Sequence, residues 1–168
     1  MSAELPISVR PATPDDATVI AEFNTRLARE TEGKRLDPAT ILAGVQTLLN
    51  DSRHGRYFVA ETDGQIVGQM MHTREWSDWR NGEFWWLQSV YVRQDHRQRG
   101  VFRKLLDAVT ESARQTPGVI GLRLYMERDN SAARRTYERC GFAEEGYVVL
   151  ERLLSEHHRP IDEAGPCR

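Results

Sequence analysis

Two groups of residues have types and spacing that could do chemistry. The first is the basic run Arg97-Gln98-Arg99-Gly100-Val101-Phe102-Arg103, which leads into an amphipathic helix. A helix start carries N–H groups without intrahelical acceptors and the positive end of the helix dipole, so it can hold a phosphate. Successive N–H groups in such a turn can surround a diphosphate, and Gly100 lets the backbone approach it closely. The run indicates an anionic ligand, although a short pattern of this kind, taken alone, is more often a plain turn with a solvated basic face.

The second group runs from Asn130 to Phe142 and reads NSAARRTYERCGF. Asn130 and Tyr137 are seven residues apart, so on a helix they lie on one face about two turns from each other. A tyrosine hydroxyl near a reacting centre can donate a proton or a hydrogen bond. The alternative that the pattern leaves open is a core tyrosine whose hydroxyl is satisfied within the protein.

The elements that must position these groups follow from hydrophobic periodicity and turn signals. Apolar spacing and N-cap signals predict helices from Thr13-Pro14 to about Glu30, from Asp37-Pro38 onward, from Gly100 to about Gln115 and over Ser131–Cys140. Strands are predicted at Ile7–Arg10, Tyr57–Ala60, Ile66–Thr73, Phe84–Val92, Val119–Tyr125 and Tyr147–Leu153, with a hairpin turn at Asp63-Gly64 and a polar connection over Trp76–Gly82.

The resulting order is β-α-α-β-β-β-α-β-α-β, without repeats or linkers. Phe84–Val92 has little polar alternation, as expected for a central strand covered on both faces. Two helices follow strands in the second half, which gives crossover units. The sequence therefore predicts a single α/β (α+β) domain over residues 1–155, with a mixed, mostly antiparallel central sheet flanked by helices, and a flexible C-terminal tail over 156–168.

Composition limits the kinds of ligand and compartment. The chain has 168 residues and a formal net charge of −2, so no global field favours nucleic acid, and the local basic cluster favours a small anionic ligand. Two cysteines, Cys140 and Cys167, make neither a disulfide framework nor a metal site, and we expect no metal. Without a signal-like or membrane-spanning run, we expect a cytoplasmic protein without a membrane partner.

Taken together and in this order, the two groups resemble the motifs of the GNAT superfamily of acyl-CoA-dependent N-acetyltransferases. The first matches the pyrophosphate motif R/Q-x-x-G-x-G/A after a VYV-type strand, and the second matches N-x-x-A-x-x-x-Y-x-x-x-G-F. The resemblance extends over the element order from Ile7 to about Leu153. One position departs from it, because Phe102 stands where the family has Gly or Ala. We expect this side chain to point into the core with the apolar face of its helix.

The resemblance implies acetyl-CoA as the acyl donor and a role for each matching residue. Tyr137 would protonate the departing thiolate, and Asn130 would contact the cofactor arm. The strand residues Val90, Tyr91 and Val92 would offer backbone groups to the pantetheine arm and the acetyl carbonyl. The diphosphate would lie on the motif itself, formed by Arg97, Gln98, Arg99, Gly100, Val101, Phe102 and Arg103.

The implied function is an N-acetyltransferase that acts on a primary amine of a small molecule or peptide by direct attack on the thioester. The alternative is a non-catalytic acyl-CoA-binding sensor or scaffold of the same fold, against which Tyr137 argues. An amine acceptor must lose a proton to a base or to water. The candidate bases are Glu83, Glu75, Asp78 and Glu30, and for each of them an ordinary surface carboxylate is the favoured interpretation.

The tryptophans are the remaining chemical signal. Trp85 and Trp86 adjoin in the predicted central strand, so they face opposite sides of the sheet and at least one should be core. Trp76 and Trp79 fall in the predicted polar connection. They could line an acceptor pocket through cation–π contact, or cover a sheet edge or a homodimer interface. The sequence identifies neither the acceptor nor the oligomeric state.

Overall fold

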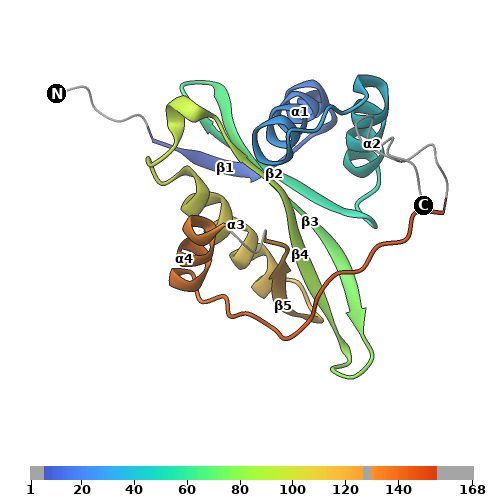
Figure 1. Ribbon diagram of the computed structural model, residues 1–168. Coiled ribbons are helices and arrows are strands. Elements are labelled where there is room, and N and C mark those ends of the chain that lie inside the picture. Colours follow the sequence, from blue (N-terminus) through green and yellow to red (C-terminus); the bar gives the residue numbers. More distant parts are fainter. Residues whose placement is uncertain (1–5, 127–129, 155–168) are drawn as a thin grey trace.

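The computed structural model describes residues 6–126 and 130–154. Its centre is a five-stranded sheet in the order β1-β2-β3-β4-β5. Strands β1 to β4 pair antiparallel and β4 pairs parallel with β5, which confirms the predicted mixed, mostly antiparallel sheet. Helices α1 and α2 lie on one side of the sheet, and α3 and α4 lie on the other (Figure 1).

The elements follow the predicted order up to the last helix. The strands are β1 (Ser8–Pro11), β2 (Gly55–Thr62), β3 (Gln65–Ser77), β4 (Gly82–Val92) and β5 (Val119–Leu124). The helices are α1 (Ala17–Glu32), α2 (Pro38–Asn50), α3 (Val101–Gln115) and α4 (Ser131–Arg139), with short 3₁₀ turns at Pro14–Asp16 and Gln94–His96.

The first two helices begin where their capping residues place them. Thr13 and Asp16 form a capping box around the 3₁₀ turn that leads into α1. Asp37 caps α2, because its carboxylate accepts a hydrogen bond from the Thr40 backbone N–H at 2.8 Å. The 3₁₀ turn and α2 therefore start at the predicted positions, Pro14 and Pro38, and α1 itself begins three residues later than predicted, at Ala17.

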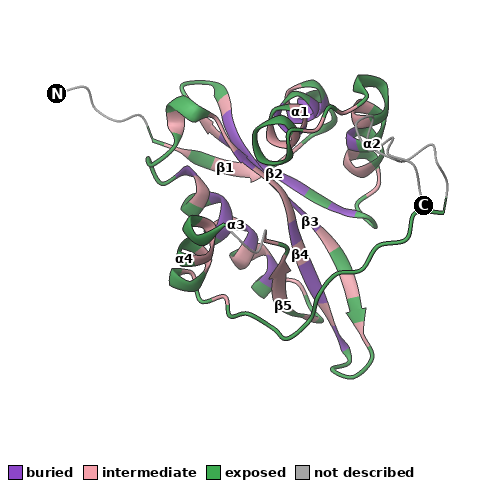
Figure 2. Cartoon of the chain, in the orientation of Figure 1, coloured by how far each residue is buried: buried purple, intermediate pink, exposed green. Residues whose placement is uncertain are grey.

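Each face of the sheet has its own apolar core, so β2 and β3 contain runs of consecutive buried residues whose side chains alternate between the two cores (Figure 2). Phe58 and Ala60 of β2 face α3, whereas Tyr57 and Val59 face α1 and α2. The α3 side contains a cluster of apolar side chains from three strands and one helix, among them Met70, Trp85, Leu87, Val101, Leu105, Leu106 and Val109. The predicted apolar face of α3 is thereby confirmed.

The prediction of a polar connection over Trp76–Gly82 was wrong in its extent. Strand β3 continues through Ser77 and β4 already begins at Gly82, with Trp76 opposite Glu83. Only residues 78–81 form the turn, where Asn81 has a left-handed φ of 46°. The polar residues of this arm made it look like a loop, whereas cross-strand pairing with β4 holds it extended.

The predicted strand Tyr147–Leu153 is absent from the described part of the chain, which is irregular after α4. Side chains of this segment are exposed, up to 90% for Leu150. Glu144 pairs with Arg134 of α4, and no pairing of residues 147–153 with a strand is present. β-prone residues form a strand only when they meet a partner edge, so propensity alone misled here. The predicted tail 156–168, with Cys167, lies outside the described residues.

One further observation concerns membranes. Among residues 6–126 and 130–154, no helix combines the length and apolar character needed to cross a bilayer.

Candidate active site

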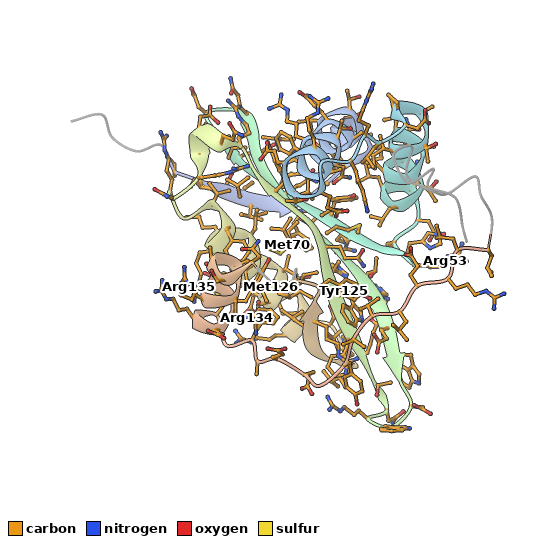
Figure 3. All side chains as sticks on the ribbon, in the orientation of Figure 1. Arg53, Met70, Tyr125, Met126, Arg134 and Arg135 are labelled. Carbon is orange, nitrogen blue, oxygen red and sulfur yellow. The ribbon has the colours of Figure 1, made fainter. Side chains whose placement is uncertain are left out.

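Strands β4 and β5 pair over only part of their length. The last parallel pair is Leu87 with Leu124, and β4 continues to Val92 without a neighbour on that side among the described residues. Tyr125 and Met126 follow the end of β5 in the middle of the molecule (Figure 3). The two strands therefore separate after Leu87, and the backbone of β4 beyond this point has an open edge, which we call the β4 edge (residues 88–92).

The direction of the backbone groups on the β4 edge follows from its pairing with β3. The Arg93 N–H donates to the Val67 carbonyl at 2.9 Å, so Arg93 and Tyr91 direct their backbone groups toward β3. Because alternate residues of a strand point to opposite neighbours, Val90 and Val92 direct theirs to the open edge. The Val92 carbonyl there accepts a hydrogen bond from Arg97 Nε at 3.0 Å. The groups that remain toward the opening are the Val92 N–H and both backbone groups of Val90.

The turn before α3 has the geometry of an anion site. Gln98 and Gly100 both have left-handed backbones, with φ of 62° and 78°. The first helical hydrogen bond runs from the Lys104 N–H to the Gly100 carbonyl, and no side chain caps the helix. The N–H groups of Val101, Phe102 and Arg103 therefore lie at a helix start without an intrahelical acceptor. Arg99 and Lys104 beside them are exposed.

Arg97, the first residue of the same motif, is exposed, but its side chain is tied to other elements of the fold. Its guanidinium pairs with Glu30 at 2.5 Å and lies over the Tyr91 ring at 5.7 Å. Tyr91 in turn donates its hydroxyl hydrogen to Glu30 at 2.9 Å. These contacts, Arg97 foremost, hold the pKa of Glu30 below its usual range. Arg97 thus ties the turn to α1 and β4, with its charge matched by a carboxylate.

Helix α4 places the second motif against α3. Asn130 caps α4, because its side-chain oxygen accepts the Ala133 N–H at 3.0 Å. The Tyr137 ring lies edge-on between Phe102 and Phe142, at 5.8 Å from each. Burial raises the pKa of the Tyr137 hydroxyl, and the neighbouring Cys140 acts in the same direction. A tyrosine with a raised pKa keeps its proton at neutral pH, as a proton donor must.

Phe102, the departure from the family pattern, points as expected. It is half-buried against the core cluster on the α3 side and contacts Tyr137. Arg103 turns along the helix surface, where it pairs with Asp107 at 3.0 Å and reaches Cys140 Sγ at 3.8 Å. Cys140 packs at the end of α4 against the same core.

The four candidate bases differ in their surroundings. Glu83 accepts from Trp85 Nε1 at 2.8 Å, on the α3 face and near the far end of β4. The Asp78 carboxylate accepts a hydrogen bond from the Trp79 backbone N–H at the hairpin tip. Glu30 is engaged by Arg97 and Tyr91, and its lowered pKa makes it a weaker base. Glu75 pairs with Arg123 at 2.6 Å and accepts the Trp86 indole N–H.

Sequence reasoning missed a polar and aromatic surface on the α1 side of β3, β4 and β5. Trp86 stacks on Tyr125 with ring centroids 4.3 Å apart, and Gln88 donates to Thr73 at 2.7 Å. Trp85 is buried on the opposite face, so the expected division of this tryptophan pair is confirmed. Strand alternation could have placed Trp86 and Gln88 on one face, but only pairing with β5 adds Tyr125.

The exposed tryptophans lie elsewhere. Trp76 and Trp79 are 61% and 91% exposed on the β3–β4 hairpin arm. Trp76 pairs with Glu83, which is four residues before Leu87 on β4, a separation of about 13 Å. The α3 turn thus contacts the β4 edge through Arg97 and Val92, and α3 contacts the Tyr137 helix through Phe102, whereas Trp76 and Trp79 lie away from the strand separation.

Comparisons with known proteins identify the family and the fold. The sequence profile of the acetyltransferase (GNAT) family matches residues 21–142. The crystal structure of a possible acetyltransferase from Clostridium difficile 630 is similar, with 43% identity and a TM-score of 0.83, over 90% of this chain and 99% of that one.

Two further proteins are similar to this chain at lower sequence identity. The spermidine N(1)-acetyltransferase of Vibrio cholerae serotype O1 is 21% identical over 113 residues, which is 67% of this chain and 63% of that protein. The chain therefore spans less than two thirds of this curated relative. An aminoglycoside acetyltransferase from an uncultured soil metagenomic sample, solved with sisomicin, has a TM-score of 0.72 at 16% identity over 89% of this chain and 97% of that one. At that identity the likeness concerns the fold.

Proposed function

We propose that this chain, which belongs to the acetyltransferase (GNAT) family, transfers an acetyl group from acetyl-CoA to a primary amine by direct attack. Family membership makes it an acyltransferase. The observation that carries the finer proposal is a series of contacts that links three features. Arg97 in the turn before α3 donates to Val92 of the open β4 edge, α3 starts without a side-chain cap, and Phe102 of α3 meets the half-buried Tyr137 of α4.

The residues present suit an acyl-CoA. The helix start at Val101 offers N–H groups to the diphosphate, and the left-handed turn at Gly100 has open space on its outer side. Gln98, Arg99 and Arg103 would contribute around it, while Arg97 supports the turn through Glu30. Bound acetyl-CoA supplies a thioester whose carbonyl carbon accepts the amine.

The protein's part in the reaction is to orient and to move protons. The amine nitrogen forms a bond to the carbonyl carbon, and the carbon–sulfur bond breaks. The Val90 N–H, directed toward the open edge, would stabilise the negative charge that develops on the carbonyl oxygen. Tyr137 would give its proton to the departing thiolate sulfur and regain one from solvent. The acceptor nitrogen loses two protons in all, one when the ammonium ionises and one after the C–N bond has formed, and the second makes up for the proton that Tyr137 regains from solvent. Both would leave to water or to Glu75, which pairs with Arg123 but is the candidate carboxylate beside the Trp86–Tyr125 stack.

For the acceptor we propose a small-molecule amine that approaches from the α1 side. The surface there carries Trp86 and Tyr125 in a stack, with Glu75 between Trp86 and Arg123. Aromatic faces and a carboxylate suit a cationic amine. The relatives named above act on spermidine or were solved with an aminoglycoside, so polyamines and aminoglycosides head the panel.

The test is thiol release from acetyl-CoA with a panel of polyamines, aminoglycosides, amino acids and peptides, together with a thermal shift by CoA. We expect amine-dependent thiol release and a raised Tm with CoA. A clear shift without turnover on any amine would support the non-catalytic acyl-CoA-binding alternative. An unchanged Tm with CoA and no turnover would contradict the cofactor assignment itself.

A further inference from the structure

A closed set of polar side chains lies in the core between α1 and the sheet. Gln69 of β3 and Asn24 of α1 are 0% and 6% exposed. Gln69 Nε2 donates to Asn24 Oδ1 at 2.7 Å, and Asn24 Nδ2 donates to the Tyr57 hydroxyl at 3.0 Å. Burial raises the pKa of Tyr57, while hydrogen bonds with the side chains of Asn24 and Ser89 oppose that rise. Burial of such polar groups costs free energy unless they form hydrogen bonds, so their presence on an apolar face requires an explanation.

The set ends on the backbone of β4. Gln69 Nε2 also donates to the Ser89 carbonyl at 3.2 Å. Ser89 has a φ of 49°, a left-handed conformation that costs a non-glycine residue roughly 1–2 kcal/mol, and it occupies the interior of a strand. The β3–β4 register shifts beside this position, and the pairing with β5 ends two residues earlier. Ser89 is therefore a strained residue at the start of the β4 edge, and Gln69 holds its carbonyl.

Because the peptide bond is planar, the hydrogen bond between Gln69 and the Ser89 carbonyl also sets the direction of the Val90 N–H. In a trans peptide the carbonyl of one residue and the N–H of the next point in opposite directions. Because the Ser89 carbonyl points inward to Gln69, the Val90 N–H must point away from Gln69. This agrees with the independent result from the Arg93–Val67 hydrogen bond, which directs Val90 to the open edge. One buried amide thus fixes the direction of the N–H that faces the opening.

We propose that Gln69 is a positioning residue that holds the strained Ser89–Val90 peptide so that the Val90 N–H meets the acyl carbonyl oxygen. This inference rests on the proposed function. A side chain that served only packing would be better apolar, because Gln69 Oε1 is buried without a hydrogen-bond partner among the described residues. Its Nε2 group, by contrast, is shared between Asn24 and Ser89, and the second of these partners is a backbone atom of the candidate site.

The test compares Gln69→Met, which keeps the volume and removes the donor, with Val45→Ala. Val45 is 2% exposed in α2, away from β4, so its truncation lowers stability without touching the site. We expect Gln69→Met to lower kcat for thiol release by about 10- to 100-fold, since a misdirected oxyanion donor loses much of its effect. The KM for acetyl-CoA should change by less than about twofold. Val45→Ala should keep the wild-type kcat at temperatures where it is folded.

A second substitution separates positioning from packing. Glycine adopts a φ of 49° at little cost, so it needs no side chain to hold it there. Ser89→Gly introduced into Gln69→Met should restore part of the lost kcat, whereas a packing defect at Gln69 would not respond. If Gln69→Met does not fold, Asn24→Ala removes the partner that orients the same amide, and the same measurements apply.

The inference is overturned if Gln69→Met keeps the wild-type kcat, or if Val45→Ala loses as much. A crystal structure of Gln69→Met gives a readout that is independent of activity. A turned Ser89–Val90 peptide supports the proposal, and an unchanged Ser89 φ contradicts it. Absence of thiol release and of a CoA thermal shift in the wild type contradicts the proposed function instead, so the two failures are distinguishable.

Discussion

The two sides of β4 are built differently. On the α1 side, side chains reach β4 through hydrogen bonds from distant parts of the chain, with Gln69 on the Ser89 carbonyl and Glu30 on the Tyr91 hydroxyl. On the α3 side β4 packs against apolar side chains, Arg97 donates to the Val92 carbonyl, and the first N–H groups of α3 have no acceptor within the helix. Around the β4 edge, residues 88–92, the α1 side thus supports the strand, and the α3 side has the N–H groups that we propose for the acyl donor.

This difference teaches how a family of this kind can keep a precise backbone at an open edge. An edge strand without a neighbour has no ladder to hold it on that side, so its geometry must come from the other side. Around residues 88–92, changes on the α3 side should therefore affect turnover or ligand affinity, whereas changes among the supporting residues on the α1 side should act through stability and through the direction of β4.

The largest effect should come from Tyr137→Phe on the α3 side. Removal of the proton donor is expected to lower kcat by about 100-fold or more, with CoA affinity nearly unchanged. The measurement is steady-state thiol release together with CoA titration. Tyr147→Phe is the matched control, because Tyr147 is 80% exposed and lies outside the site. Unchanged turnover in Tyr137→Phe would return Tyr137 to a packing role and weaken the distinction between the two sides.

An intermediate effect is expected for Gly100→Ala at the start of α3. The left-handed φ of 78° penalises alanine by about 1 kcal/mol, although a Cβ there meets no protein atom within 4 Å. We expect a lower Tm and weaker CoA binding, by up to about tenfold if the N–H groups move. Gly44→Ala in α2 is the control, and it should raise stability by about 0.5–1 kcal/mol. Equal CoA affinity in wild type and Gly100→Ala would argue against the turn as the diphosphate site.

The smallest effect should come from Glu30→Gln on the α1 side. Because Arg97 lowers the pKa of Glu30, the folded state binds fewer protons there, and this stabilisation is present above about pH 4.5 and lost as pH falls below it. Glu30→Gln should lose less than about 1 kcal/mol at pH 7 and show a weaker fall of stability between pH 5 and 3. Urea unfolding between pH 5 and pH 3 measures this change in the free energy of unfolding. Glu22→Gln, which removes the partner of Arg26, is the control. A large loss of kcat at unchanged stability would instead place Glu30 among the catalytic residues.

Most of the fold could be predicted from local patterns. Caps at Thr13 and Asp37, the apolar face of α3 and the continuous run of β4 each involve neighbours along the chain, so the sequence carries them directly. The hairpin arm at 76–82 and the segment 147–153 were predicted wrongly in opposite senses. In both segments, a strand forms only if the backbone pairs with a neighbouring strand, and the preferences of the individual residues do not show whether that pairing occurs.

The site was predictable where it coincides with a motif and not where it depends on distant pairs. The turn at Gly100 and the helix of Tyr137 follow from spacing. The stack of Trp86 on Tyr125 and the support of Ser89 by Gln69 join residues that no local pattern relates. A left-handed serine inside a strand leaves no signature in the sequence at all, because serine shows no preference that would reveal it.

The sequence by itself determined the two motifs at 97–103 and 130–142, the order of their elements up to α4 and the apolar faces on which they rest, since all of these are local patterns along the chain. Only the tertiary structure decided which polar groups support β4 and which remain open to a ligand. The physical reason is the separation of the partners, because Arg97 meets Glu30 across 67 residues and Gln69 meets Asn24 across 45. Hydrogen bonds over such distances exist only once the sheet and its two layers of helices have formed.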